Sequence, residues 1–82
     1  MDVTQEQVSK MRHCIGLNYK KKPYRNYFYC TSPNPLWEDL VEKGLARKRG
    51  GVESGDVVYH LTYEAGKELY GKPISQKYYK AM

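Results

Sequence analysis

The chain has 82 residues, a formal net charge of +5 and two cysteines, so we expect one small domain. So few cysteines argue against a secreted disulfide scaffold and favour the reducing cytoplasm of a cell, and no apolar run approaches the roughly 20 residues that cross a membrane. Nine of the apolar residues are tyrosines, whose hydroxyls need water or a partner.

The basic residues are segregated along the sequence. No acidic residue lies between Glu6 and Glu38, although this interval contains several lysines and arginines. A second basic cluster spans residues 47–49, and residues 72–82 contain three lysines and no acid. Such segregation either creates a positive surface that attracts phosphate or merely solvates one face of a small protein.

A first helix is predicted over residues 5–15. Thr4 and Gln7 have the spacing of a capping box, and Val8, Met11 and Ile15 form an apolar stripe at helical spacing. Gly16 is suited to the left-handed residue that ends a helix.

Residues 18–33 break this pattern. Residues 20–25, which we call the arm, begin with three lysines and a proline, and residues 24–30 are typical of an aromatic-rich strand. Basic residues interleaved with exposed rings are typical of single-stranded nucleic-acid binding, although such rings also cover small cores. The candidate nucleic-acid contacts here are Lys20, Lys21, Lys22, Tyr24, Arg25, Tyr27 and Tyr29.

A second helix is predicted over residues 35–43, with Asn34 as its cap and Pro35 at its first position. Its outward positions include Glu38, Asp39 and Glu42, and these carboxylates would be repelled by phosphate. The helix is therefore a poor reader of a nucleic-acid groove.

A hairpin follows, with strands near 45–49 and 57–61 and a glycine-rich tip that predicts flexibility. We call residues 45–61 the wing, and Arg47, Lys48 and Arg49 are its candidate nucleic-acid contacts. A third helix is predicted over 63–70, and residues 72–82 form a basic C-terminal tail, either flexible or packed as a partner-dependent arm. The predicted core comprises Val8, Met11, Ile15, Trp37, Leu40, Val41, Leu45, Val58, Leu61 and Leu69.

Two resemblances follow from these motifs. Gly44-Leu45-Ala46-Arg47-Lys48-Arg49 with Tyr59-His60-Leu61-Thr62 resembles the wing and closing helix of winged-helix repressors. Met11-Arg12-His13, Lys22-Pro23-Tyr24-Arg25-Asn26-Tyr27 and Trp37-Glu38-Asp39-Leu40-Val41 are similar to a group of small phage and prophage proteins of unknown function. We therefore expect residues 1–71 to form an α+β winged-helix-like domain, with three helices and a two- or three-stranded antiparallel sheet. Where the repressors have a helix before the recognition helix, this chain has the arm.

The sequence contains no recognisable catalytic set, so we expect neither an enzyme nor a cofactor. His13, Cys14, Cys30 and His60 lack the paired spacing of a zinc site, so no metal is expected. Two hypotheses remain for a phage accessory protein in the host cytoplasm. The leading one is nucleic-acid binding through the arm and wing, and the alternative is binding to a host or phage protein through exposed tyrosines.

Overall fold

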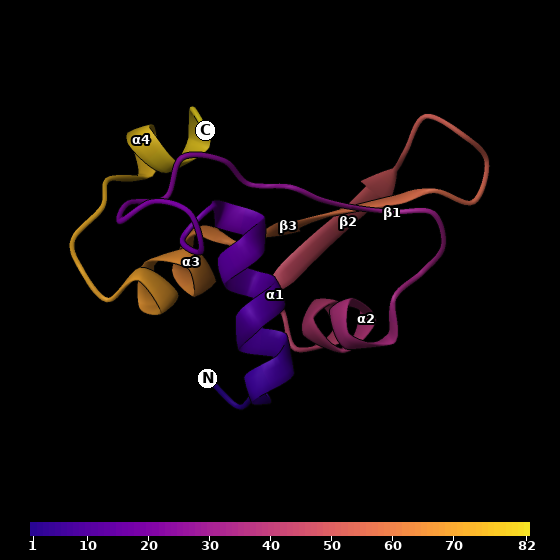
Figure 1. Cartoon of the computed structure of the whole chain (residues 1–82), viewed down its shortest axis with the longest axis horizontal. Helices are drawn as coiled ribbons and strands as arrows, with labels where there is room; N and C mark the ends of the chain where they lie inside the picture. Colours follow the sequence, from indigo (N-terminus) through magenta and orange to yellow (C-terminus); the bar gives the residue numbers. More distant parts are fainter.

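Four helices and a three-stranded antiparallel sheet make up the computed structural model, which describes all 82 residues (Figure 1). The sheet order is β1-β3-β2. The predicted α+β class, the three helices and the hairpin are confirmed, and the segment before residue 30 adds the third strand. This arrangement is compatible with a winged-helix-like domain. In chain order the elements are α1 (Gln5–Ile15), β1 (Phe28–Cys30), α2 (Pro35–Glu42), β2 (Ala46–Gly50), β3 (Val57–Leu61), α3 (Tyr63–Tyr70) and α4 (Gln76–Lys80).

Helix α1 has both predicted caps. The Thr4 hydroxyl accepts the amide of Gln7 at 3.1 Å, and the Gln7 side chain accepts the amide of Thr4 at 2.9 Å. Gly16 ends the helix with a φ of 85°. The ring of Tyr24 lies directly over Gly16, where any Cβ would overlap it. The same glycine therefore ends α1 and receives the arm.

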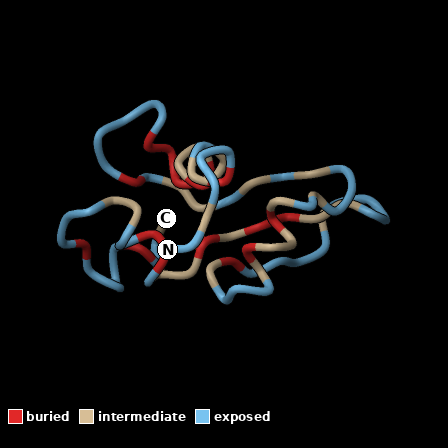
Figure 2. The backbone as a smooth tube through the Cα atoms, turned by 90° about the horizontal axis from the view of Figure 1, so that it is seen from below, coloured by how far each residue is buried: buried red, intermediate tan, exposed pale blue.

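Trp37 lies at the centre of the core. Its ring is 5.3 Å from that of Phe28 in β1 and 5.3 Å from that of Tyr59 in β3, with the Tyr59 ring stacked nearly parallel. The buried residues come from several segments that meet in the body of the molecule, whereas the wing tip is exposed (Figure 2). The buried cluster comprises Met11, Cys14, Ile15, Leu17, Trp37, Leu40, Ala46, Tyr59, Leu61 and Ala65.

Val58 is buried, as predicted, but it lies outside that cluster. Successive residues of a strand face opposite sides of the sheet, so Val58 and Leu61, three positions apart, cannot share a face. Tyr59 occupies the core in its place. Its hydroxyl donates to Glu38 at 2.5 Å and accepts the amide of Asn34 at 3.0 Å, which allows a phenol to be fully buried. Of the other predicted core residues, Val8, Val41, Leu45 and Leu69 are only half-buried.

The C-terminal tail folds back onto α3 and forms α4, which the sequence analysis did not anticipate. Tyr79 is 5 % exposed, and its hydroxyl donates to the carbonyls of Leu61 and Thr62 at 3.0 and 3.2 Å. The Tyr79 phenol occupies the space that a side chain at Gly66 would fill. A five-residue helix shows too little periodicity to be recognised in sequence, and this docking supplies the order that propensity does not.

Candidate functional site

The backbone of the arm and of the residues after it is held against α1 and β3. The amide of Tyr24 donates to the carbonyl of Ile15 at 3.2 Å, and that of Tyr27 donates to Cys14 at 3.3 Å. The Asn26 side chain pairs with both backbone groups of Leu61 at 2.9 Å, which continues the pattern of a sheet beyond β1. The arm is therefore anchored through its backbone, while its three lysine side chains are exposed.

The tail and the arm form one surface. The Tyr78 hydroxyl donates to the carbonyl of Pro23 at 2.7 Å, although the two residues are 55 positions apart. The Lys22 ammonium lies 4.2 Å from the centroid of the Tyr78 ring, within cation–π range. We call this surface the basic end, and its residues are Lys20, Lys21, Lys22, Lys72, Lys77 and Lys80.

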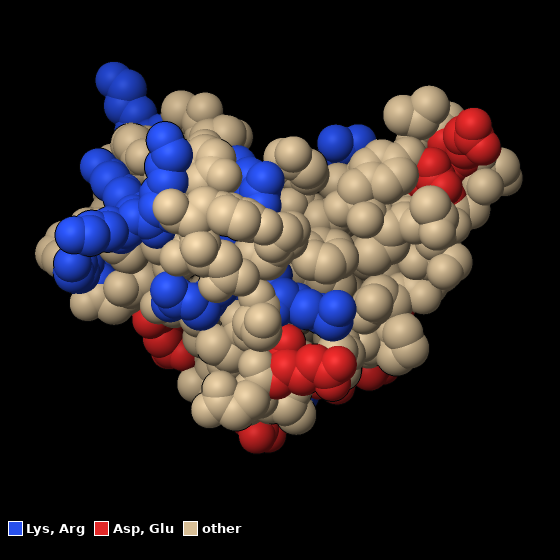
Figure 3. Space-filling model, in the orientation of Figure 1, with Lys and Arg blue, Asp and Glu red and all other residues tan.

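No carboxylate forms an ion pair with the lysines of the basic end, although Glu64 lines a depression with Lys80, and Glu64 and Glu68 line another with Lys72. The ion pairs of the protein join the N-terminus to Glu68, Lys43 to Asp39, and Lys48 to Glu38. Figure 3 shows lysines and arginines gathered at the end of the molecule that holds the arm and tail, with carboxylates at the wing tip and on the side where α1 begins. The positive charge is therefore concentrated at the end that holds the arm and tail, and the wing tip is acidic.

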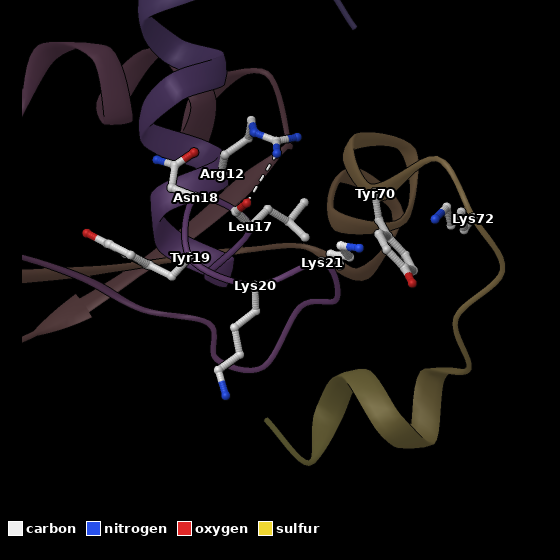
Figure 4. A pocket seen from close by; sticks show the side chains of 8 residues that line it. All are labelled: Arg12, Leu17, Asn18, Tyr19, Lys20, Lys21, Tyr70 and Lys72. Atoms are coloured by element: carbon white, nitrogen blue, oxygen red, sulfur yellow. Dashed lines mark hydrogen bonds between the residues drawn. The ribbon is translucent and has the colours of Figure 1, made fainter.

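A recess of about 380 Å³ opens on the basic end, where α1 and α3 terminate (Figure 4). Its wall includes four cations and no carboxylate. Of these cations, only Lys20 and Lys21 were among the predicted contacts. The sequence showed the acid-free charge runs, but it did not show that the end of α3 meets the arm. The lining residues are Arg12, Leu17, Asn18, Tyr19, Lys20, Lys21, Tyr70 and Lys72.

Arg25, a predicted nucleic-acid contact, is committed to internal packing. One guanidinium nitrogen donates to the carbonyl of His13 at 2.9 Å. The guanidinium carbon lies 5.4 Å from the ring centroids of Tyr19 and Tyr27 and 5.5 Å from that of Tyr24. Its buried Nε has no partner within the protein. Arg25 and Tyr24 thus hold the arm in shape, and the lysines are left as its exposed cations.

Tyr27 and Tyr29 are 49 % and 43 % exposed, but they differ in role. The Tyr29 hydroxyl donates to the carboxylate of Asp56 and accepts the amide of Val52 at 2.8 Å. The bond to Asp56 raises the pKa of Tyr29. The glycine-rich wing tip, predicted to be flexible, is thus tied to β1 through Tyr29. The Tyr27 ring is the more exposed of the two.

The basic residues of β2 point to opposite faces of the sheet. Lys48 pairs with Glu38 at 2.7 Å on the side of α2. This bond, followed by the one from Tyr59, lowers the pKa of Glu38. Burial, followed by the bond to Glu38, raises the pKa of Tyr59 to about 12. Lys48 is therefore part of a network with Glu38 and Tyr59, while 48 % of its side chain stays exposed.

Arg47 and Arg49 lie on the other face. Arg49 donates through Nε to Nε2 of His60 at 3.1 Å, and Nδ1 of His60 bonds the carbonyl of Asn26 at 2.7 Å. The carbonyl requires a proton on Nδ1, so Nε2 accepts from Arg49. Arg47 has no such partner, and it lines a depression of about 490 Å³ together with Lys80 of the tail. Of the three wing cations, Arg47 is the one that extends the basic end.

Helix α2 presents carboxylates, as the sequence indicated. Asp39 pairs with Lys43 at 2.9 Å and accepts the Gln7 side chain at 2.9 Å. The bonds from Lys43 and then Gln7 lower the pKa of Asp39. Glu42 is exposed. The face of α2 is therefore acidic.

Neither cysteine is placed for metal or nucleophilic chemistry. Cys14 is buried, and burial raises the pKa of its thiol to about 12, so the reactive thiolate is scarce at neutral pH. Desolvation also raises the pKa of Cys30. No group of three or more His, Cys, Asp or Glu side chains is arranged to hold a metal ion. None of the helices has the length and apolarity needed to cross a membrane.

The chain matches no protein-family model, no curated protein and no solved structure.

Proposed function

We propose that this protein is a non-enzymatic nucleic-acid-binding module that contacts the phosphate backbone through its basic end. One observation supports this most strongly: arm and tail, distant in sequence, meet to form a surface of six lysines without a paired carboxylate. In line with the resemblance noted in the sequence, we place it among small phage or prophage accessory proteins acting in the host cytoplasm.

Electrostatics favours binding with the basic end turned toward the nucleic acid. Neutralising phosphates with lysines releases condensed counterions, and this release supplies most of the affinity of nonspecific nucleic-acid binding. The carboxylates of the wing tip and of α2 lie away from the basic end, so they oppose other orientations. The basic end would therefore meet the nucleic acid first.

Binding through the phosphate backbone also fits the residues on the exposed side of α2 and on β2, which are not suited to reading bases. Base readout in the major groove requires an element with donors and acceptors aimed at base edges. The exposed side of α2 carries Glu38, Asp39 and Glu42, and Arg49 is bonded to His60. Affinity without sequence reading is the mode that these residues support.

The test is a salt titration of binding to random-sequence duplex and single-stranded DNA and RNA, followed by fluorescence anisotropy. Binding should weaken steeply from about 50 to 200 mM salt, with log K falling by roughly 0.9 per phosphate contact on duplex DNA. Replacing Lys20, Lys21 and Lys22 with Ala should flatten the slope by about three such contacts. A control that replaces Lys10, Lys43 and Lys48, which removes the same charge from α1, the end of α2 and β2, should change it far less. Absence of binding at about 50 mM salt, where nonspecific contacts are strong, would refute the proposal.

The exposed rings of Tyr27 and Tyr29 favour a second candidate, a module that binds a host or phage protein. Tyrosine is enriched at interface anchors because it offers apolar area and a polar tip. Tyr27→Ala would abolish capture of such a partner and would leave the salt-dependent binding of DNA to the arm nearly unchanged.

A further inference from the structure

The recess on the basic end differs from the rest of that surface because four cations from three segments line it, although the Lys20 side chain extends away from Arg12 (Figure 4). Arg12 comes from the last turn of α1, Lys20 and Lys21 from the arm, and Lys72 from the chain just beyond α3. Three separate segments therefore bring positive charge to one place. None of these four side chains forms an ion pair.

The positive side chains of the recess carry more charge than the two nearby helix ends can balance. The C-terminal ends of α1 and α3 meet here, and each contributes roughly half a negative charge. The Lys20 ammonium extends away from Arg12 and lies 5.4 Å from the centroid of the Tyr24 ring, so the other three cations leave about two positive charges to be balanced. A phosphodiester supplies one negative charge, whereas a phosphomonoester supplies about 1.5 to 2 near neutral pH. The local charge therefore matches a terminal or condensed phosphate better than a single internal linkage.

The size and walls of the recess suit a phosphorylated group. Its volume of about 380 Å³ lies at the lower end of the range of small-molecule sites, about 300–1,000 Å³. Leu17, 8 % exposed, and the half-buried Tyr70 supply apolar wall, while the lysines that line the recess stay exposed. One guanidinium nitrogen of Arg12 donates a hydrogen bond to the carbonyl oxygen of Leu17 at 3.2 Å. The other guanidinium N–H groups remain for a phosphate, which arginine can bind in bidentate geometry.

We propose that this recess binds a phosphoryl group carrying two or more negative charges, and that this group is the terminal phosphate of a nucleic-acid strand. The assignment of a strand end rests on the proposed function and deepens it. Lys22, Lys77 and Lys80, which do not line the recess, hold internal phosphodiesters, and the recess holds the end of the strand. Free polyphosphate has the same chemistry and is the other source of such a group.

The experiment compares one single-stranded DNA oligonucleotide in three forms: 5′-phosphorylated, 3′-phosphorylated and without terminal phosphate. Affinities are measured by fluorescence anisotropy for the wild type, the Lys21→Ala/Lys72→Ala double variant and a Lys77→Ala/Lys80→Ala double variant. The last of these removes the same charge from the basic end but leaves the recess intact. Binding of inorganic pyrophosphate is measured on the same proteins by calorimetry, and circular dichroism checks that each variant is folded.

The wild type should bind one phosphorylated form about tenfold more tightly than the unphosphorylated strand, as one or two added charge-assisted hydrogen bonds imply. That ratio should fall to about one in the Lys21→Ala/Lys72→Ala variant and persist in the Lys77→Ala/Lys80→Ala control. Because the ratio cancels general backbone affinity, it reports on the recess alone.

The remaining outcomes separate this inference from the proposed function. Equal affinity for all three strands, with no recess-dependent binding of pyrophosphate, overturns the inference and leaves backbone binding in place. Recess-dependent pyrophosphate binding without a terminal preference overturns the strand end and supports free polyphosphate. Pyrophosphate binding without affinity for any strand refutes the proposed function and retains the phosphoryl site.

Discussion

The arm and the wing each contain three consecutive basic residues, yet the fold leaves them in different states. In the arm, Lys20, Lys21 and Lys22 are exposed and no carboxylate pairs with them. In the wing, Lys48 is bound by Glu38 and Arg49 by His60. Strand alternation causes this difference, because it turns Lys48 toward α2 while the irregular arm imposes no such geometry. Equal charge in sequence thus gives unequal charge available to a ligand.

Both regions depend on Trp37, whose removal should have the largest effect. Trp37→Ala empties the space between Phe28 and Tyr59 and should lower the free energy of unfolding by about 3–5 kcal/mol. A domain of this size can be unfolded by such a loss. Urea denaturation measures it, with Val52→Ala, at a 90 % exposed position, as the neutral control. An unchanged melting temperature for Trp37→Ala would mean that the ring is not the core anchor.

Replacing the basic residues of the arm, and separately those of the wing, tests this difference directly. If all three arm lysines contact phosphate, substituting them with Ala should weaken duplex DNA binding by roughly 10²–10³-fold at about 0.1 M salt. Substituting Arg47, Lys48 and Arg49 should cost only about tenfold, because one contact is lost. Anisotropy at constant salt measures both. A wing variant that loses as much affinity as the arm variant would show that the network around Lys48 opens on binding.

The sequence predicted the helices and strands better than it predicted which side chains contact one another. The caps of α1 and the cap of α2 at Asn34 act through neighbours within a few positions, and the hairpin pairs two strands that follow one another in the chain, so local patterns sufficed. For the third strand, the sequence predicted an extended segment over residues 24–30 and left the sheet at two or three strands, and only Phe28–Cys30 forms β1. The core was harder to assign: Tyr59 is buried only because Glu38 and Asn34, distant in sequence, satisfy its hydroxyl.

The candidate site could be predicted only in part, for the same reason. The sequence identified the lysines of the arm as a charge run, and the structure leaves them exposed. It did not reveal that Arg25 is surrounded by three tyrosines, nor that Arg12 and Lys72 join the arm around a recess. These contacts depend on how α1, α3 and α4 pack, which no spacing along the chain encodes.

Removing the carboxylate partner of one wing cation should have a smaller effect and tests whether that pairing limits DNA binding. Glu38→Gln frees Lys48 and should leave DNA affinity unchanged or raise it severalfold, by up to one phosphate contact. It should also cost about 1 kcal/mol of stability, a value reduced by the partial exposure of the pair. Chemical denaturation and anisotropy measure the two effects. Glu42→Gln, at an exposed position, is the control.

The same variant has a pH signature. The pKa of Glu38 lies below its usual value of 4.5 because Lys48 and then Tyr59 donate to it. A lowered folded-state pKa means that the contribution to stability is fully present above about pH 4.5 and is lost as the pH falls through the folded pKa. Glu38→Gln should therefore reduce the difference in stability between pH 7 and pH 3. If the wild type and variant lose stability in parallel, the bonds from Lys48 and Tyr59 do not stabilise the charged carboxylate.

The smallest effect concerns the bond that joins tail to arm. Tyr78→Phe keeps the ring beneath Lys22 but removes the 2.7 Å hydrogen bond to Pro23. Hydrogen–deuterium exchange in α4 should accelerate, and DNA affinity should fall by no more than about fivefold, the value of one such bond. Tyr63→Phe is a matched control, since it removes a 2.6 Å bond to the carbonyl of Ile74 that holds the tail without touching the arm. Faster exchange in both variants with weaker binding in Tyr78→Phe alone would establish that the arm needs the tail to present its lysines. Equal loss of binding in both would instead assign the effect to general loosening of α4.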